Sequence, residues 1–204
     1  NRGEQFPLVL AGNISTTVQS VLFPAFSHLQ QDKHAVREAV RKSLMIGSFL
    51  VVGIMAILAG LAENLIIVLL TDKWISAVPY LQWSCLGQCF AILGMINLQT
   101  ISALGRADIS LKLEFIKTPF WFLILMIGVM ISPLAIIAGN ALYGIIAFCI
   151  NAFPNKRLLN YGVKQQALDV IYPFFLAGTI FVLLHCLQNM IPCSWISLLL
   201  EGLI

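Results

Sequence analysis

Charged residues are scarce in this sequence. Of its 204 residues, 10% are Asp, Glu, Lys or Arg and 59% are hydrophobic, whereas a soluble domain is about 25% charged. So little charge cannot cover a water-exposed surface, and the mean hydropathy of +0.92 indicates that most side chains prefer hydrocarbon. The scarcity excludes a soluble globular protein, a disordered chain and a disulfide-stapled miniprotein. The solvent of this chain is a lipid bilayer.

Catalytic and cofactor motifs are missing as well. The sequence has no phosphate-binding loop, no dinucleotide fingerprint and no acidic pair on one helix face, so it offers no case for an ATPase or a glycosyltransferase. Basic residues are too few, and aromatic residues wrongly placed, for a nucleic-acid partner. The three histidines, His28, His34 and His185, form no catalytic set by their spacing. We therefore expect a protein that is not an enzyme and has no catalytic residues and no cofactor.

The five cysteines do not form a recognisable metal site. Cys85 and Cys89 lie four residues apart on one helix face, but a structural zinc site needs four ligands, and no histidine or carboxylate accompanies them. We expect the cysteines to be small apolar packing residues and predict no metal.

Long apolar stretches are what the sequence does have. One crossing takes about 20 apolar residues, and hydrocarbon offers backbone groups no partner except one another, so the crossings must be helical. We predict an all-α polytopic transmembrane bundle, with residues 1–204 forming a single domain of about six spans and a short terminal hydrophobic stub. The predicted spans are 7–27, 43–61, 77–104, 118–132, 133–153 and 170–187, and the stub is 194–204.

Positive charge is distributed unevenly between these spans. Ten of the twelve Lys and Arg residues fall in three segments, and only Arg2 and Lys73 lie elsewhere. By the positive-inside rule the three segments face the cytoplasm, so an even number of crossings separates each pair, and the N-terminus of the chain lies outside. The ten residues are Lys33, Arg37, Arg41, Lys42, Arg106, Lys112, Lys117, Lys156, Arg157 and Lys164.

This parity argument resolves two ambiguous regions. Residues 118–153 must form a hairpin, with its turn at Ser132-Pro133, because proline disfavours a helical residue before it. The other hairpin turns at Thr71–Trp74, after a short interfacial helix at 65–70. The basic segment 27–43 has helical spacing, and we expect it to lie along an anionic leaflet.

Uncharged polar residues inside the spans need partners or water. They either form hydrogen bonds between packed helices or line a hydrated cavity suited to sugar hydroxyls, and the sequence leaves both interpretations open. Lys117 stands at the start of a span, where it either reaches out to lipid headgroups or contacts a substrate phosphate.

Several motifs, some of them at loop positions that hydrophobicity does not dictate, recur along nearly the whole chain in a familiar order. They are NRGEQFP (1–7), VLFPAFSHLQ (21–30), RKSL within 37–44, LAENL (61–65), KW (73–74), AVPYL (77–81), ALGRAD (103–108), NAFPNKRL (151–158) and YG (161–162). In sequence and spacing these motifs resemble the Wzx-type oligosaccharide flippases of bacteria.

The resemblance implies membership of the superfamily of multidrug, oligosaccharidyl-lipid and polysaccharide exporters, in the bacterial inner membrane. Such proteins have two helical lobes around a central cavity, with roughly twelve to fourteen helices in internal repeats. This chain would be most of the second lobe, and because Asn1 is not a methionine we expect it to begin within a longer protein. Its partners would be the first lobe, which the sequence lacks, a lipid-linked oligosaccharide and membrane lipids.

The implied function is the flipping of undecaprenyl-diphosphate-linked repeat units for export of O-antigen, capsule or exopolysaccharide. The cavity candidates are Asn13, Gln19, Gln88, Asn97 and Gln99 for sugar hydroxyls, with Lys117 and Arg2 for the diphosphate. Three alternatives stay open: a cation-coupled drug antiporter of the same fold, a non-catalytic part of a membrane polysaccharide polymerase or ligase, and a membrane scaffold that transports nothing. An antiporter would rely on an acid deep in a span, and a polymerase or ligase on a large outer loop; the sequence shows neither.

Overall fold

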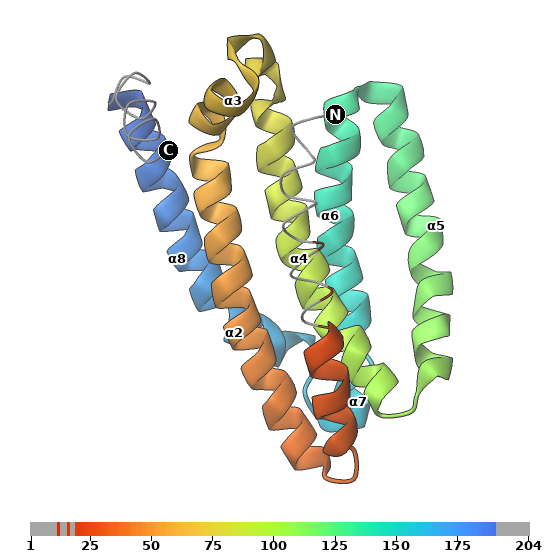
Figure 1. Ribbon diagram of the computed structural model, residues 1–204. Coiled ribbons are helices and arrows are strands. Elements are labelled where there is room, and N and C mark those ends of the chain that lie inside the picture. The colour runs from red at the N-terminus through yellow and green to blue at the C-terminus, as the bar shows by residue number, and fades with distance from the viewer. Residues whose placement is uncertain (1–11, 13–15, 17–18, 191–204) are drawn as a thin grey trace.

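Five long helices stand side by side in a single row (Figure 1). The computed structural model describes residues 12, 16 and 19–190, and in this part of the chain every regular element is helical. Neighbours in the row pack in the order α8, α2, α4, α6, α5. Their bounds are α2 (Lys33–Gly60), α4 (Val78–Ala103), α5 (Ala107–Ile131), α6 (Pro133–Ala152) and α8 (Val163–Met190).

All five helices are long and apolar enough to cross a membrane. They correspond to the second through sixth predicted spans and confirm the all-α polytopic bundle for the described residues. About half of the first predicted span, 7–27, and all of the stub, 194–204, lie outside those residues; residues 19–28 are helical. The division into a single domain stays a prediction.

Short helical segments connect the long ones at both ends of the row. At one end α3 (Ala62–Leu70) and the 3-10 helix η1 (Asp72–Ala77) join α2 to α4, which confirms the predicted short helix before a turn at Thr71. At the other end α7 (Asn155–Leu159) joins α6 to α8.

The predicted turn at Ser132-Pro133 is confirmed. Ser132 is extended, with φ −171° and ψ 161°, and its hydroxyl accepts a hydrogen bond of 3.1 Å from the backbone N–H of Ala135. Pro133 follows as the first residue of α6, where a missing N–H costs nothing. Because an extended cap separates two helices, α5 and α6 form a hairpin and not one long helix.

The helical spacing of the basic segment 27–43 is confirmed from Lys33 onward, but the expectation that it forms a separate helix along a leaflet is wrong. Lys33 to Lys42 are the first ten residues of α2 and continue directly into its apolar part. Asp32 starts the helix by accepting hydrogen bonds from the backbone N–H groups of His34 and Ala35, at 2.9 and 3.1 Å. Three side chains of this part of α2 are fully buried against the bundle, those of Val36, Val40 and Leu44. The basic segment therefore cannot lie separately along a leaflet.

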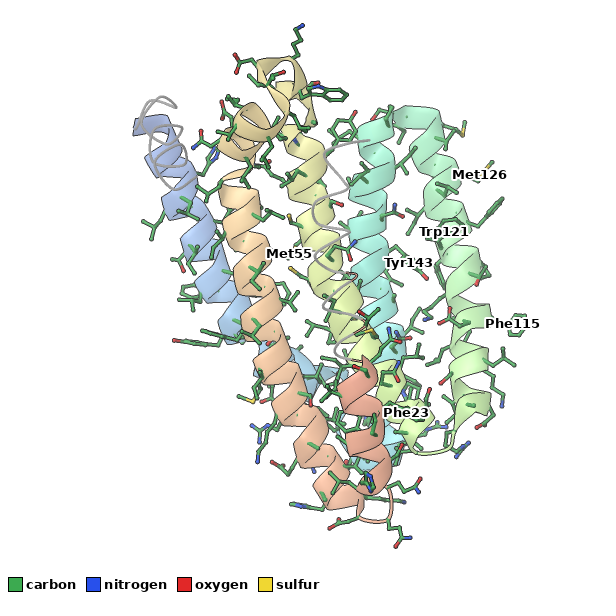
Figure 2. The ribbon with its side chains drawn as sticks, in the orientation of Figure 1. Phe23, Met55, Phe115, Trp121, Met126 and Tyr143 are labelled. Carbon is green, nitrogen blue, oxygen red and sulfur yellow. The ribbon has the colours of Figure 1, made fainter. Side chains whose placement is uncertain are left out.

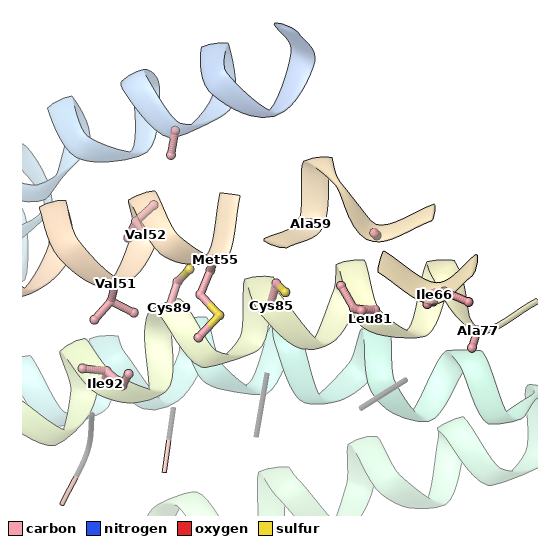
Figure 3. Close-up of a cluster of buried hydrophobic side chains, with 12 residues drawn as sticks. Val51, Val52, Met55, Ala59, Ile66, Ala77, Leu81, Cys85, Cys89 and Ile92 are labelled. Atoms are coloured by element: carbon pink, nitrogen blue, oxygen red, sulfur yellow. The ribbon is translucent and has the colours of Figure 1, made fainter. Parts of the chain in front are cut away.

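The core consists of two clusters, which lie toward opposite ends of the helices. One cluster joins α2, α3 and α4 around Met55, Leu81 and Ile92 (Figure 3). The other surrounds Phe26 and Tyr161, next to the basic residues.

Small residues set the spacing between α4 and α6. A side chain on Gly144 would meet the carbonyl oxygen of Gly87 at 3.2 Å. Lipid tails are as apolar as the surface of a neighbouring helix, so membrane helices associate through close backbone contacts of this kind.

Helix α5 is the least buried member of the row. Only three of its residues, Leu113, Lys117 and Gly128, are buried, while Phe115 and Met126 project away from the bundle (Figure 2). At Gly128 a side chain would come within 2.9 Å of the α-carbon of Ile136. The helix is thus fastened mainly through its hairpin partner α6.

Candidate functional site

The basic residues gather at one end of the helices, the end at which α2, α5 and α8 begin and α4 and α6 end (Figure 1). We call this the basic end. Of the Lys and Arg residues in the described part of the chain, only Lys73, in η1, lies at the opposite end. The layout agrees with the loop pattern expected from the charges.

Three buried amides join three helices near the basic end. Asn97 of α4 donates to the side-chain oxygen of Gln166 of α8 at 2.8 Å and accepts from Asn155 of α7 at 2.6 Å. All three residues are fully buried. Hydrogen bonds of this kind between membrane helices contribute about 0.6 kcal/mol on average and up to about 2 kcal/mol. We call these residues the amide chain.

A second polar group ties α8 to α2. The guanidinium of Arg41 donates twice to the carboxylate of Asp169, at 3.0 and 3.1 Å, and the hydroxyl of Tyr161 donates to the same carboxylate at 2.7 Å. Such a two-point contact fixes direction as well as distance. We call Arg41, Tyr161 and Asp169 the carboxylate cluster.

Tyr161 connects the two groups. Its carbonyl oxygen accepts a hydrogen bond from Gln166 of the amide chain, at 3.2 Å, while its hydroxyl belongs to the carboxylate cluster. Burial, and then the hydrogen bond to Asp169, raise the pKa of Tyr161 well above its ordinary value. The hydroxyl therefore stays protonated near neutral pH and remains a donor.

Arg37 covers the outer side of Tyr161. Its guanidinium carbon lies 6.0 Å from the centre of the tyrosine ring, within the range of a cation–π contact. Its Nε is buried and has no hydrogen-bond partner among the described residues. Within the described part of the chain, Arg37 thus supplies the basic end with a buried donor that no hydrogen bond uses.

The candidates from the sequence are not brought together. Asn97 lies in the amide chain, whereas Gln88 and Gln99 are half-buried elsewhere on α4. Gln19 is exposed and donates to the sulfur of Met95 at 3.0 Å. Arg2 and Asn13 lie outside the described residues.

Lys117 is paired with a carboxylate. The ammonium, in a side chain only 6% exposed, lies 2.5 Å from Glu114, one turn earlier in α5. Its side chain therefore does not reach out to the lipid headgroups, because it is packed within the helical row.

Sequence reasoning missed most of the polar groups at the basic end. Asn155, Tyr161, Gln166 and Asp169 lie between or before the predicted spans, in segments interpreted as loops. The spacing of Gln166 and Asp169, three residues apart at the start of a helix, was the available signal, because such residues share one helix face.

The opposite half of α2, α4 and α8 holds an apolar groove of about 480 Å³. Cys85 and Cys89 line it as free thiols, and Met55 faces them from α2 (Figure 3). Among the described residues no three His, Cys, Asp or Glu side chains are grouped as metal ligands.

Comparison with known proteins finds similarity to membrane proteins of polysaccharide biosynthesis. Residues 1–79 match the family described as "Polysaccharide biosynthesis protein". The lipopolysaccharide biosynthesis protein WzxC of Escherichia coli K12 is 28% identical over 167 residues, which cover 80% of this chain and 34% of that protein.

Two other relatives are similar over comparable lengths. An uncharacterized membrane protein in the cps region of Klebsiella pneumoniae is 27% identical over 80% of the chain and 33% of its own length. An uncharacterized membrane protein of Methanocaldococcus jannaschii is 25% identical over 92% of the chain and 36% of its own length. The chain thus spans about a third of these relatives, and no solved structure matches it significantly. The family match over residues 1–79, the similarity to WzxC and the multi-pass helical row together make the chain similar to Wzx-type membrane proteins of polysaccharide biosynthesis.

Proposed function

We propose that this chain is most of one helical lobe of a transporter that flips undecaprenyl-diphosphate-linked oligosaccharide repeat units across the bacterial inner membrane. The transported units would serve export of O-antigen, capsule or exopolysaccharide. The observation that carries the proposal is the match to a lipopolysaccharide biosynthesis protein along 80% of a chain with five membrane-crossing helices. A first lobe would complete the transporter, since the chain spans about a third of its relatives.

The polar groups at the basic end give the lobe a mechanical role. An oligosaccharide head group cannot cross hydrocarbon unaided, and transporters of this kind open a path by rocking one bundle against another. Rocking requires that each bundle move as one piece. The amide chain and the carboxylate cluster join α2, α4, α7 and α8 at that end and make these helices one body.

We place the basic end in the cytoplasm, following the positive-inside rule. Thiol labelling of the full-length protein, with its native cysteines replaced, tests this orientation. A cysteine at Lys156 is expected to react only after the membrane is made permeable, and the matched cysteine at Lys73, at the opposite end, to react from outside. Labelling of the Lys156 position from outside reverses the orientation.

In this proposal the head group of the substrate lies between the first lobe and this lobe. Gln19, Gln88 and Gln99 are the proposed contacts for sugar hydroxyls, with Asn13 and Asn97, and Lys117 and Arg2 are proposed for the diphosphate. Asn97 and Lys117 already have protein partners. They contact substrate only in a state in which those partners are released.

Deletion of the gene tests the function. We expect loss of surface polysaccharide, with lipid-linked single repeats accumulating on the cytoplasmic leaflet, and recovery on expression of the full-length protein. Accumulation of single repeats on the outer leaflet instead would support the polymerase or ligase interpretation. Normal surface polysaccharide in a deletion strain without a second flippase would refute the proposal.

A further inference from the structure

The groove between α2, α4 and α8 is lined by both small and bulky side chains. Ala56, Ala59 and Gly178 leave the space open, and Trp83 and Phe181 flank it. A side chain on Gly178 would meet no atom within 4 Å, so the groove is open at this position.

The described lining offers water few polar partners. Gln82 carries its only side-chain amide, and the nitrogen of that amide donates to the carbonyl oxygen of Ala59 at 3.3 Å. A water molecule needs two to four polar partners to occupy such a site. Between helices that cross a membrane, the space is therefore filled by hydrocarbon.

The dimensions of the groove fit one leaflet. From Gln82 to Cys89 it follows α4 for about 10 Å, at 1.5 Å per residue, whereas half of a hydrocarbon core measures about 15 Å. At the end nearer the basic residues, Phe90 of α4 stacks on Phe174 of α8, with ring centres 5.0 Å apart, and closes it. Toward η1 it begins about 6 Å from the start of α4.

We propose that this groove binds one acyl chain of a bilayer phospholipid from the leaflet next to α3 and η1. The Phe90–Phe174 stack stops the chain near the middle of the bilayer, where the acyl chains of one leaflet end. A polyprenyl tail, longer than a leaflet, does not fit a groove closed at this depth. The bound chain fills the space between α4 and α8 and holds the distal half of α8 against α2.

Photocrosslinking of the full-length protein tests the site. The protein is placed in vesicles of phosphatidylethanolamine and phosphatidylglycerol that contain a small fraction of phosphatidylcholine with a diazirine near the end of one acyl chain. After illumination, mass spectrometry is expected to find crosslinks on the lining peptides of α2, α4 and α8, around Met55, Leu86 and Phe174.

Two glycine substitutions provide a matched pair. Gly178→Leu fills the groove, and because displacing about two buried methylenes removes about tenfold in affinity, crosslinking to the lining peptides is expected to fall about tenfold. Gly53→Leu makes the same change on α2, also with no atom within 4 Å but outside the lining, and is expected to crosslink like the wild type. Ala56→Leu, on the opposite wall, repeats the test if Gly178→Leu fails to accumulate.

Equal crosslinking in all variants would overturn the proposal. So would labelling confined to the exposed side chains of α5, or a disulfide from a cysteine at Gln82 to another segment of the same protein, which would show that protein covers the groove. Competition by a soluble polyprenyl phosphate, but not by phospholipid, would assign the groove to the carrier lipid and overturn it as well. The readout is independent of polysaccharide export, so failure here leaves the proposed transport function standing.

Discussion

The same three helices, α2, α4 and α8, are held together in opposite ways at their two ends. At the basic end side-chain hydrogen bonds and an ion pair cross between them, and buried amides are matched to one another. In the other half they surround an apolar groove whose one amide bonds to a backbone carbonyl. Directional bonds allow one arrangement, whereas hydrocarbon contacts tolerate small shifts at little cost. We infer that the basic end is the fixed end of this lobe and the groove half is the adaptable one.

The largest effect is expected from Asp169→Ala. The change leaves the Arg41 guanidinium and the Tyr161 hydroxyl without their shared acceptor. Because Arg41 is about half exposed and water can replace its contact, most of the loss comes from the buried Tyr161 hydroxyl, at about 2–3 kcal/mol, typical of a hydrogen bond to a charged group. Unfolding of the detergent-solubilised full-length protein measures it.

Asp108→Ala is the matched control for that change. Asp108 pairs with Arg106 at the same end, but both side chains are about half exposed and only two residues apart. Surface pairs of this kind contribute little to stability, so we expect a much smaller loss than for Asp169→Ala. Equal losses in the two variants would show that the carboxylate cluster does not fix α8 to α2.

A somewhat smaller effect is expected from Asn97→Leu. The substitution strands the buried oxygen of Gln166 and the buried amide nitrogen of Asn155, which costs about 1–3 kcal/mol. Combining it with Gln166→Leu in a double-mutant cycle measures the coupling, expected at about 0.6–2 kcal/mol. Additive losses would mean that the amide chain does not act as a unit.

Tyr161→Phe removes one hydroxyl and keeps the ring beneath Arg37. We expect a loss of about 1 kcal/mol and a change in pH dependence. The pKa of Tyr161 is raised in the folded protein, so its stabilisation is complete below the unfolded pKa of about 10 and declines as the pH rises above it. Stability measured between pH 8 and 11 should fall more steeply in the wild type than in the variant; parallel curves would contradict the buried donor.

The smallest effect is expected in the groove half. Gln82→Leu removes a single bond to the carbonyl of Ala59 and should change stability by less than about 0.5 kcal/mol, because that carbonyl is already part of a helix. A loss as large as that of Asn97→Leu would erase the proposed difference between the two ends.

The sequence predicted the row of helices well because each element leaves a local trace. The hairpin at Ser132-Pro133 followed from charge parity and proline chemistry, and α3 followed from a span already complete at Leu61. The continuation of α2 back to Lys33 was missed because ten residues with four basic side chains were interpreted as a separate helix on the membrane surface, although Asp32 is a good start for one continuous helix.

The polar contacts could not be predicted in the same way. Arg41 and Asp169 are 128 positions apart, and no periodicity within either helix identifies the partner. Asn97 was singled out as a polar residue in a span, but its sequence left interhelical bonding and cavity lining equally open. Hydrogen bonds occupy both the nitrogen and the oxygen of the Asn97 side-chain amide. Asn97 would therefore contact substrate only in a second conformation.

The turn at Ser132 has a consequence for how the protein is made. A ribosome delivers α5 to the membrane before α6 exists, yet α5 buries almost nothing except against α6. Its outward-facing Phe, Trp and Met side chains let it rest in lipid alone. Its charged residues all lie in its first eleven positions, and the deepest of them, Lys117, is already paired with Glu114 within the helix. Because Ser132 and Pro133 form the turn between α5 and α6, the hairpin can enter the bilayer as one unit and pack against α4 later.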